Sequence, residues 1–159
     1  MSFRIGIGYD VHRLEEGREF VLGGISIPFK KGPVGHSDGD VLIHAICDAM
    51  LGALALGDIG RHFPDTEEEF RDIDSKLLLE KTINLIRFYG YKISNIDSTV
   101  CLQKPKISEH VPEMEKVLSN ILGIDEHQIS IKATTTEKLG FVGEELGISA
   151  YAVALLVLS

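Results

Sequence analysis

The stretch FRIGIGYDVH, residues 3–12, decides how the fold begins. Its apolar side chains alternate with arginine, glycine, aspartate and histidine, and a period of two is typical of a β-strand. Asp10 and His12 therefore share the strand face opposite the apolar row. An acid and an imidazole two positions apart on one face of a strand are candidates for a metal or catalytic site.

Strand-like and helix-like segments alternate along the rest of the chain. The sequence FVLGGISIPF, residues 20–29, predicts a hairpin that turns at Gly23-Gly24. Residues 41–56 predict a buried helix with an acidic start and a stop at Gly57, and residues 58–72 predict a loop. Further helices are expected over residues 74–89 and 108–122, and strands from residue 95 to a turn at Pro105 and over 129–136 and 147–158. This order predicts one domain of the α/β (α+β) class over residues 1–159.

The composition favours a soluble globular protein. Of the 159 residues 44% are hydrophobic and 25% charged, and the formal net charge is −8. This acidic balance disfavours nonspecific binding to nucleic acid or to acidic membranes. No signal peptide and no apolar run of membrane-spanning length is present, and the two cysteines lie far apart. We therefore expect a reduced, cytoplasmic protein.

A metal centre is one interpretation of three of these side chains. Asp10, His12 and His44 would supply oxygen and nitrogen ligands and leave a fourth position open, which is the layout of a catalytic zinc site. Asp48, one helical turn beyond His44, could orient its ring. The alternative is that each residue is ordinary: a turn or surface pair for Asp10 and His12, and a hydrogen-bonded core histidine for His44.

Two polar segments could contact phosphate. HSDGD, residues 36–40, is either an N-cap cluster, which the pattern favours, or an anion site at a helix start. KATTTEKLG, residues 132–140, places threonine hydroxyls beside Glu137, a suitable magnesium ligand. It lacks the glycines of a Walker A loop, and an ordinary strand followed by a turn would explain the threonines equally simply.

The last apolar run, Gly147 to Leu158, is apolar on both of its alternating faces. It is either a central strand covered on both sides or a strand whose second face meets a neighbouring subunit. We favour burial in an oligomer.

These motifs, taken in order, resemble the 2-C-methyl-D-erythritol 2,4-cyclodiphosphate synthase family of the non-mevalonate isoprenoid pathway. The resemblance runs nearly end to end and rests on GYDVHR, LGG, HSDGDVLIHAICDAMLGALALGDIG, FPDT and IKATTTEKLGFVG. It implies a mixed sheet with helices on one face, in a homotrimer whose sheets face the axis and whose active sites lie at subunit interfaces. It also implies a phosphorus–oxygen lyase that converts 4-diphosphocytidyl-2-C-methyl-D-erythritol 2-phosphate into the cyclic diphosphate and CMP.

The resemblance assigns roles to individual residues. It implies that Asp10, His12 and His44 bind zinc and that Glu137 binds magnesium or manganese together with the substrate diphosphate. His36 and Thr135 would be catalytic, as stabilisers of the transition state. The residues implied to contact substrate are Asp10, His12, Ser37, Asp58, Gly60, Phe63, Pro64, Asp65, Pro105, Lys106, Thr134, Thr136, Glu137 and Phe141.

One departure from the family pattern concerns the expected trimer axis. Many members carry an arginine and a glutamate there, whereas this sequence has Glu144 and Leu146. We therefore expect weak or absent binding of isoprenoid diphosphates at the axis. Two other functions remain open for the chain as a whole, a zinc phosphohydrolase and a non-catalytic trimeric module that binds a cytidine ligand or a partner protein.

Overall fold

The computed structural model describes residues 2–70 and 72–159. Its main sheet has five strands in the order β4-β1-β7-β5-β6, where β5 and β6 are parallel and the other pairs antiparallel. A separate hairpin joins β2 to β3 at Gly23-Gly24, as predicted. The strands are β1 Phe3–Glu16, β2 Phe20–Leu22, β3 Ile25–Ile27, β4 Lys31–Val34, β5 Tyr91–Cys101, β6 Ile129–Thr134 and β7 Gly147–Leu158.

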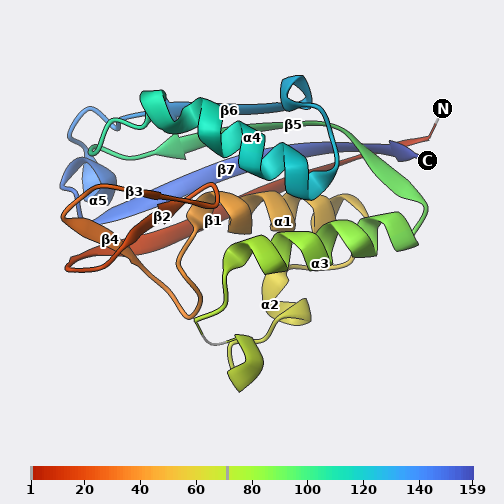
Figure 1. Ribbon diagram of the computed structural model, residues 1–159, viewed down its shortest axis with the longest axis horizontal. Helices are drawn as coiled ribbons and strands as arrows, with labels where there is room; N and C mark the ends of the chain where they lie inside the picture. Colours follow the sequence, from red (N-terminus) through yellow and green to blue (C-terminus); the bar gives the residue numbers. More distant parts are fainter. Residues whose placement is uncertain (1, 71) are drawn as a thin grey trace.

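The long helices pack on one side of the main sheet (Figure 1). These are α1 Val41–Ala53, α3 Ser75–Phe88 and α4 Val111–Leu122, with short helices α2 Ile59–His62 and α5 Gly140–Gly143 and 3-10 turns at Glu68–Phe70, Ser108–His110 and Glu126–Gln128. A mixed sheet with helices on one face confirms the predicted fold class. None of the helices in the described residues is both long and apolar enough to cross a membrane.

The start of α1 is as predicted, but its predicted end is wrong. Asp40 caps the helix by accepting a hydrogen bond from the Ile43 amide at 3.1 Å. The helix ends at Ala53 and not at Gly57, because Ala55 adopts a left-handed conformation with φ of 57°. The amide of Leu56 then bonds the carbonyl of Leu51, which closes the helix in the way a glycine usually does.

Other segments differ from the sequence prediction as well, since β5 begins at Tyr91 and not at residue 95, and β6 ends at Thr134 and not at residue 136. Part of the predicted loop over residues 58–72 is α2, because Asp58 accepts a hydrogen bond from the Arg61 amide and caps a single turn. Strand β4 was not predicted, since Gly32 and Pro33 are unfavourable inside a strand. Its place at the edge of the sheet, paired only with β1, explains why it tolerates them.

The two faces of β1 have opposite roles. The apolar side chains of Phe3, Ile5 and Ile7 are 65–70% exposed. The other face packs on α1 through glycines: a Cβ atom on Gly8 would lie 1.8 Å from the Ala45 carbonyl oxygen, and one on Gly6 would be similarly excluded by α1. Strand and helix backbones are therefore in direct contact, which brings the residues that follow Gly8 close to α1.

The central strand β7 is also covered on one face only. Ile148, Ala150 and every second residue to Leu156 are buried on the helix side, while Tyr151 and Val153 on the other side are 46% and 36% exposed. The alternative of a strand covered on both faces within one chain is therefore wrong. Together with β1, this strand presents an open apolar sheet face.

Candidate active site

Asp10, His12 and His44 meet at one point between β1 and α1. Oδ2 of Asp10 lies 2.9 Å from Nε2 of His12 and 2.9 Å from Nδ1 of His44, and the two nitrogens are 3.2 Å apart. Within residues 2–70 and 72–159, these three form the one group of at least three Asp, Glu, His or Cys side chains that could hold a metal ion together. Tetrahedral zinc with bonds of about 2.0–2.1 Å places its ligand atoms roughly 3.3–3.4 Å apart. The three ligand atoms are therefore close enough to share one metal ion.

The tautomer of His12 is fixed by the neighbouring strand. Nδ1 of His12 lies 2.8 Å from the carbonyl oxygen of Val34 on β4. A carbonyl only accepts hydrogen bonds, so Nδ1 carries the proton and the lone pair of Nε2 points toward Asp10 and His44. A neutral imidazole in this orientation is a metal ligand.

The acid and the imidazole on β1 shift each other's pKa. Burial alone would raise the pKa of Asp10, but hydrogen bonds and charge from His12 and His44 outweigh burial and lower it to about 2. Burial alone would lower the pKa of His12, but its hydrogen bond to Asp10 and the Asp10 charge raise it. The carboxylate thus stays ionised and attracts positive charge, either a proton on His12 or a cation.

Two serines, and not Asp48, contact the outer nitrogen of His44. Nε2 of His44 lies 2.9 Å from Oγ of Ser75 and 3.1 Å from Oγ of Ser37. The prediction that Asp48 orients this ring is wrong, because its carboxylate accepts the Ile59 amide at 2.8 Å and anchors α2 to α1. Ser75 was not predicted as a site residue, since its only sequence signal was its place at a helix start.

A cavity of about 280 Å³ opens beside the three candidate ligands. It gathers several of the predicted substrate-binding residues on β1, on the loop before α1 and on the segment that carries α2. Its lining consists of Asp10, His12, His36, Ser37, His44, Ile59, Gly60, Phe63, Asp65, Phe70, Ile73 and Leu78. We call this cavity the metal pocket. Asp58 caps α2 at its border, and Pro64 lies between the lining residues Phe63 and Asp65.

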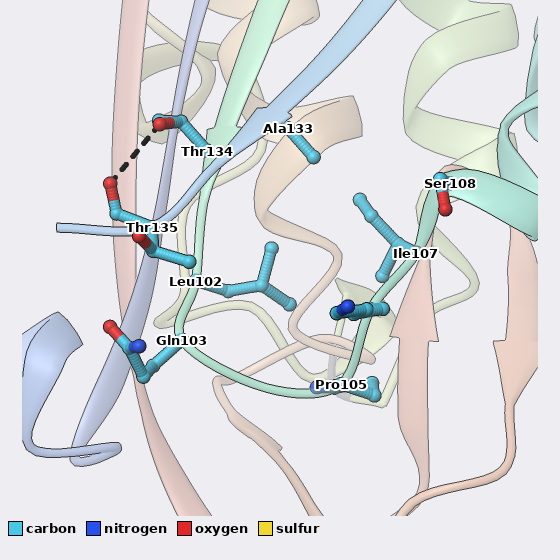
Figure 2. Close-up of a pocket in the computed structure, with 9 residues that line it drawn as sticks. Leu102, Gln103, Pro105, Ile107, Ser108, Ala133, Thr134 and Thr135 are labelled. Carbon is cyan, nitrogen blue, oxygen red and sulfur yellow. Dashed lines mark hydrogen bonds between the residues drawn. The ribbon is translucent and has the colours of Figure 1, made fainter. Parts of the chain in front are cut away.

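A second cavity of about 200 Å³ lies where β5 and β6 end (Figure 2). We call it the threonine pocket. Its lining consists of Leu102, Gln103, Pro105, Lys106, Ile107, Ser108, Ala133, Thr134 and Thr135. Thr134 and Thr135 lie side by side in Figure 2, and the Thr134 hydroxyl donates to the Thr135 carbonyl at 3.1 Å. The structure therefore brings Pro105 and Lys106 together with two of the predicted threonines.

The loop after the threonine pocket is exposed and turns sharply. Glu137 and Lys138 have φ of 52° and 65°, a left-handed conformation that costs free energy for residues other than glycine. The Thr135 hydroxyl lies 3.4 Å from Oε1 of Glu137, and the Thr136 hydroxyl donates to the Leu139 carbonyl at 2.8 Å. The hydroxyls of Thr135 and Thr136 therefore contact other groups of the same loop. Glu137 does not belong to the group of Asp10, His12 and His44.

Phe141 lines neither the metal pocket nor the threonine pocket. It borders a third cavity, of about 500 Å³, together with Leu146 and residues 11–14 of β1, among them His12, which also lines the metal pocket. The Phe141 ring is 45% exposed.

The two pockets open at the same end of the sheet but stand apart within one chain. Val11 on β1 pairs with Ser149, Ser149 with Cys101, and Cys101 with Thr134. These strands follow one another in the sheet, so β1 and β6 are separated by three strand spacings, or about 14 Å. The predicted zinc ligands and the predicted phosphate-binding threonines are thus not adjacent in a single copy.

Comparison with known proteins identifies the family. The model of the YgbB family matches residues 3–157. The chain belongs to this family. A relative from Bacteroides fragilis, named 2-C-methyl-D-erythritol 2,4-cyclodiphosphate synthase, is 58% identical over 156 residues, which cover 98% of each chain. A relative of the same name from Syntrophomonas wolfei is 54% identical over 153 residues, 96% of this chain and 98% of its own length. The family resemblance seen in the sequence is confirmed.

Solved structures of YgbB-type synthases have the same fold. The bifunctional IspDF from Campylobacter jejuni superposes with a TM-score of 0.96 at 40% identity, covering 99% of this chain and 43% of that chain. IspF from Plasmodium falciparum, solved as a CDP complex, superposes with a TM-score of 0.88 at 40% identity and covers 99% of this chain and 97% of that chain.

Proposed function

We propose that this YgbB-family chain converts 4-diphosphocytidyl-2-C-methyl-D-erythritol 2-phosphate into 2-C-methyl-D-erythritol 2,4-cyclodiphosphate and CMP. It would act as a phosphorus–oxygen lyase of the non-mevalonate isoprenoid pathway in the cytoplasm, with residues 1–159 as one catalytic domain. The observation that carries the proposal is the meeting of Asp10, His12 and His44 at one point beside a cavity, in a chain of this family.

Two cations are part of the proposal. Asp10, His12 and His44 would hold zinc, and Glu137 would hold magnesium or manganese together with the substrate diphosphate. When bound, these ions supply positive charge to phosphate oxygens, which an acidic chain with a net charge of −8 otherwise lacks. The exposed position of Glu137 supports a ligand that takes up its ion with substrate.

The residues of the chain would act mainly by positioning. The attacking phosphate and the β-phosphorus belong to one molecule, and well-oriented intramolecular reactions gain roughly 7–11 kcal/mol of the barrier. A phosphate dianion is already a nucleophile at neutral pH, so no general base is needed. His36 and Ser37 border the metal pocket and Thr134 and Thr135 the threonine pocket, where they would hold phosphate oxygens in line as CMP leaves.

The two pockets divide the proposed substrate. The threonine pocket, with Pro105 and Lys106, would take the cytidine end, and the CDP complex of the Plasmodium falciparum relative supports a cytidine diphosphate ligand. In the metal pocket, Asp58 and Gly60 would hold the ribose. The remaining proposed substrate contacts are Phe63, Pro64 and Asp65 around the methylerythritol, with Thr136 and Phe141 on or near the loop that carries Glu137.

A homotrimer would complete the site. The open sheet face carries Phe3, Ile5 and Ile7 at 65–70% exposure, together with Tyr151 and Val153, and a free chain would leave these apolar side chains in water. Because one chain separates its two pockets by about 14 Å, we propose that neighbouring copies pair the metal pocket of one with the threonine pocket of the next. Their sheets would face the trimer axis.

Sedimentation tests this assembly. Ile7→Lys places a charge on the open face and is expected to convert the trimer to monomer with loss of turnover. Phe88→Lys, at an 82% exposed site on α3, is the matched control and should stay trimeric. A wild-type chain that sediments as a monomer would contradict the assembly.

Phosphorus NMR of the product tests the reaction. The proposal predicts a cyclic diphosphate and CMP from the methylerythritol substrate. A zinc phosphohydrolase, which the same three ligands would suit, would give open phosphates. A binding module would retain a cytidine ligand without releasing CMP, and either outcome would refute the synthase.

A further inference from the structure

We propose that His62 is a positioning residue, which holds α2 and the residues that it carries in place beside the metal pocket. The inference rests on the proposed function and deepens it, because Asp58, Gly60 and Phe63 are the proposed contacts for the ribose and the methylerythritol. His62 is not among the described residues that line the metal pocket. It acts through the backbone of the segment that does.

The helix α2 is too short to be stable through its own sequence. It spans only Ile59–His62, and forming a single helical turn fixes several backbone torsions for one hydrogen bond. Glycine, which stands at position 60, is one of the least favourable residues inside a helix. In Figure 1, α2 lies outside the layer formed by α1 and α3. The turn therefore depends on side chains that hold it from outside.

Two carboxylates hold the start of α2. Oδ1 of Asp48 accepts the Ile59 amide at 2.8 Å and joins the turn to α1. Oδ1 of Asp58 accepts the Arg61 amide at 3.0 Å and caps the turn. Both contacts engage backbone amides of the turn, and neither reaches its last residue or Phe63. The end of α2 must be fixed by another group.

The His62 side chain holds that end. From a half-buried position, its Nε2 lies 2.9 Å from the carbonyl oxygen of Leu56, in the connection between α1 and α2. A carbonyl only accepts hydrogen bonds, so Nε2 carries a proton and donates it. The loop between the two residues is compact, since Gly57 has φ of 88° and a Cβ atom there would lie 3.0 Å from Cδ of Arg61. The end of α2 is thereby tied back to the end of α1.

Holding His62 also fixes Phe63, the next residue. The Phe63 amide donates to the Ile59 carbonyl at 2.7 Å and continues the turn. The centre of its ring lies 6.3 Å from that of His62 and 5.6 Å from that of Phe70. Phe63 and Phe70 both line the metal pocket. The hydrogen bond from His62 to Leu56 is therefore made one residue away from a wall of the metal pocket.

The variant His62→Leu separates the hydrogen bond from packing. Leucine keeps an apolar side chain beside Phe63 and is more favourable in a helix than histidine, but it cannot donate to Leu56. Any loosening of α2 in this variant must therefore come from the lost hydrogen bond. His62→Gln is the matched control, because its terminal amide can donate to the same carbonyl.

Affinity for CDP, measured by isothermal titration calorimetry on the zinc-loaded chain, is the first test. Losing one hydrogen bond of this kind is expected to weaken CDP binding about three- to tenfold in His62→Leu. His62→Gln should stay within about twofold of wild type. Zinc affinity should be unchanged in both variants, because the candidate ligands lie on β1 and α1. A His62→Leu chain that also loses zinc would show a general structural role and overturn the proposal.

Amide hydrogen exchange of the metal-free chain, followed by NMR, is the second test, because it reports the hold on α2 without ligand or activity. The Arg61 and Phe63 amides should exchange about three- to tenfold faster in His62→Leu than in wild type and in His62→Gln, with α1 unchanged. Either wild-type exchange or wild-type CDP affinity in His62→Leu would overturn the positioning role. Wild type that binds no CDP would instead refute the proposed function, while the exchange result would still decide the role of His62.

Discussion

The metal pocket and the threonine pocket are built in opposite ways. In the metal pocket, His44 is buried, every ring nitrogen of His12 and His44 has a polar neighbour, and the backbones of β1 and α1 touch through Gly8. In the threonine pocket, Thr134 and Thr135 are exposed, and their hydroxyls contact only their own loop. The first pocket is formed by folding, whereas the second presents groups that a ligand or a neighbouring copy must engage.

Because of this difference, substitutions in the two pockets should have different effects on stability and on activity. Changes under the metal pocket should disturb the fold and the ion together, because packing and ligation use the same elements. Changes of the exposed threonines at the threonine pocket should leave the fold intact and alter only turnover.

Gly8→Ala is expected to have the largest effect. The new Cβ atom would lie 1.8 Å from the Ala45 carbonyl oxygen, so β1 and α1 must separate. We expect a loss of at least about 3 kcal/mol in the free energy of unfolding, and loss of zinc. Urea titration measures it. Gly52→Ala on α1 is the control, since its Cβ would meet nothing closer than 3.9 Å, and it should be neutral or stabilising. If Gly8→Ala and Gly52→Ala were equally stable, the claim that β1 and α1 pack in direct backbone contact at Gly8 would be contradicted.

Replacing the candidate ligands should remove the ion and the reaction while the chain still folds. Asp10→Asn and His44→Ala are expected to lower turnover by about 10³-fold or more, because the charge that offsets the phosphates is lost. Zinc content by atomic absorption and CMP release measure the two effects. His127→Ala, an exposed histidine outside both pockets, should retain both. Full zinc stoichiometry in the first two variants would contradict the ligand assignment.

Thr135→Ala tests the other pocket. Losing one hydroxyl aimed at a phosphate oxygen is expected to reduce turnover by about 10²-fold. The melting temperature and zinc content should not change, because Thr135 is exposed and distant from the metal pocket. Ser130→Ala, which removes an exposed hydroxyl on β6, the strand that precedes Thr135, should leave turnover unchanged. A Thr135→Ala chain that melts far below wild type would show that this pocket is structural after all.

Of the changes considered, a change of pH is expected to have the smallest effect, and it acts on the stability of the metal-free chain. The pKa of Asp10 is lowered from 3.8 to about 2, so its stabilisation is present above pH 3.8 and lost as the pH falls through about 2. The pKa of His12 is raised from 6.5, so its stabilisation is complete below pH 6.5 and lost as the pH rises through the raised value. Melting curves of the metal-free chain should therefore show a decline above pH 6.5 that Asp10→Asn lacks. Parallel curves for both chains would contradict the coupling.

Much of this arrangement could be predicted from the sequence, because it depends on local patterns. The alternation in residues 3–12 placed Asp10 and His12 on one face, and the predicted start of the helix at residue 41 and end of the helix at residue 122 are confirmed. The meeting of His44 with β1 was a hypothesis only, since the contact of Gly8 with α1 is a long-range packing event that no local pattern reports.

Other features could not be predicted, because they depend on partners distant in the chain. Ser75 and Asp38 are 37 positions apart, and for the Asp38 cluster the sequence suggested a helix cap or an anion site but no contact with Ser75. Asp48 has helical spacing from His44, but α2 provides an amide that takes its carboxylate instead. The sequence also could not show which face of β1 is exposed, since alternation identifies two faces without saying which one packs on a helix.

Release of CMP from the methylerythritol substrate, with and without a chelator, tests the central claim most directly. If a cation held by the metal pocket is needed to bring the two phosphates together, release should stop when the chain is stripped of metal and return when zinc and magnesium are restored. Undiminished release from a fully metal-free chain would contradict the account.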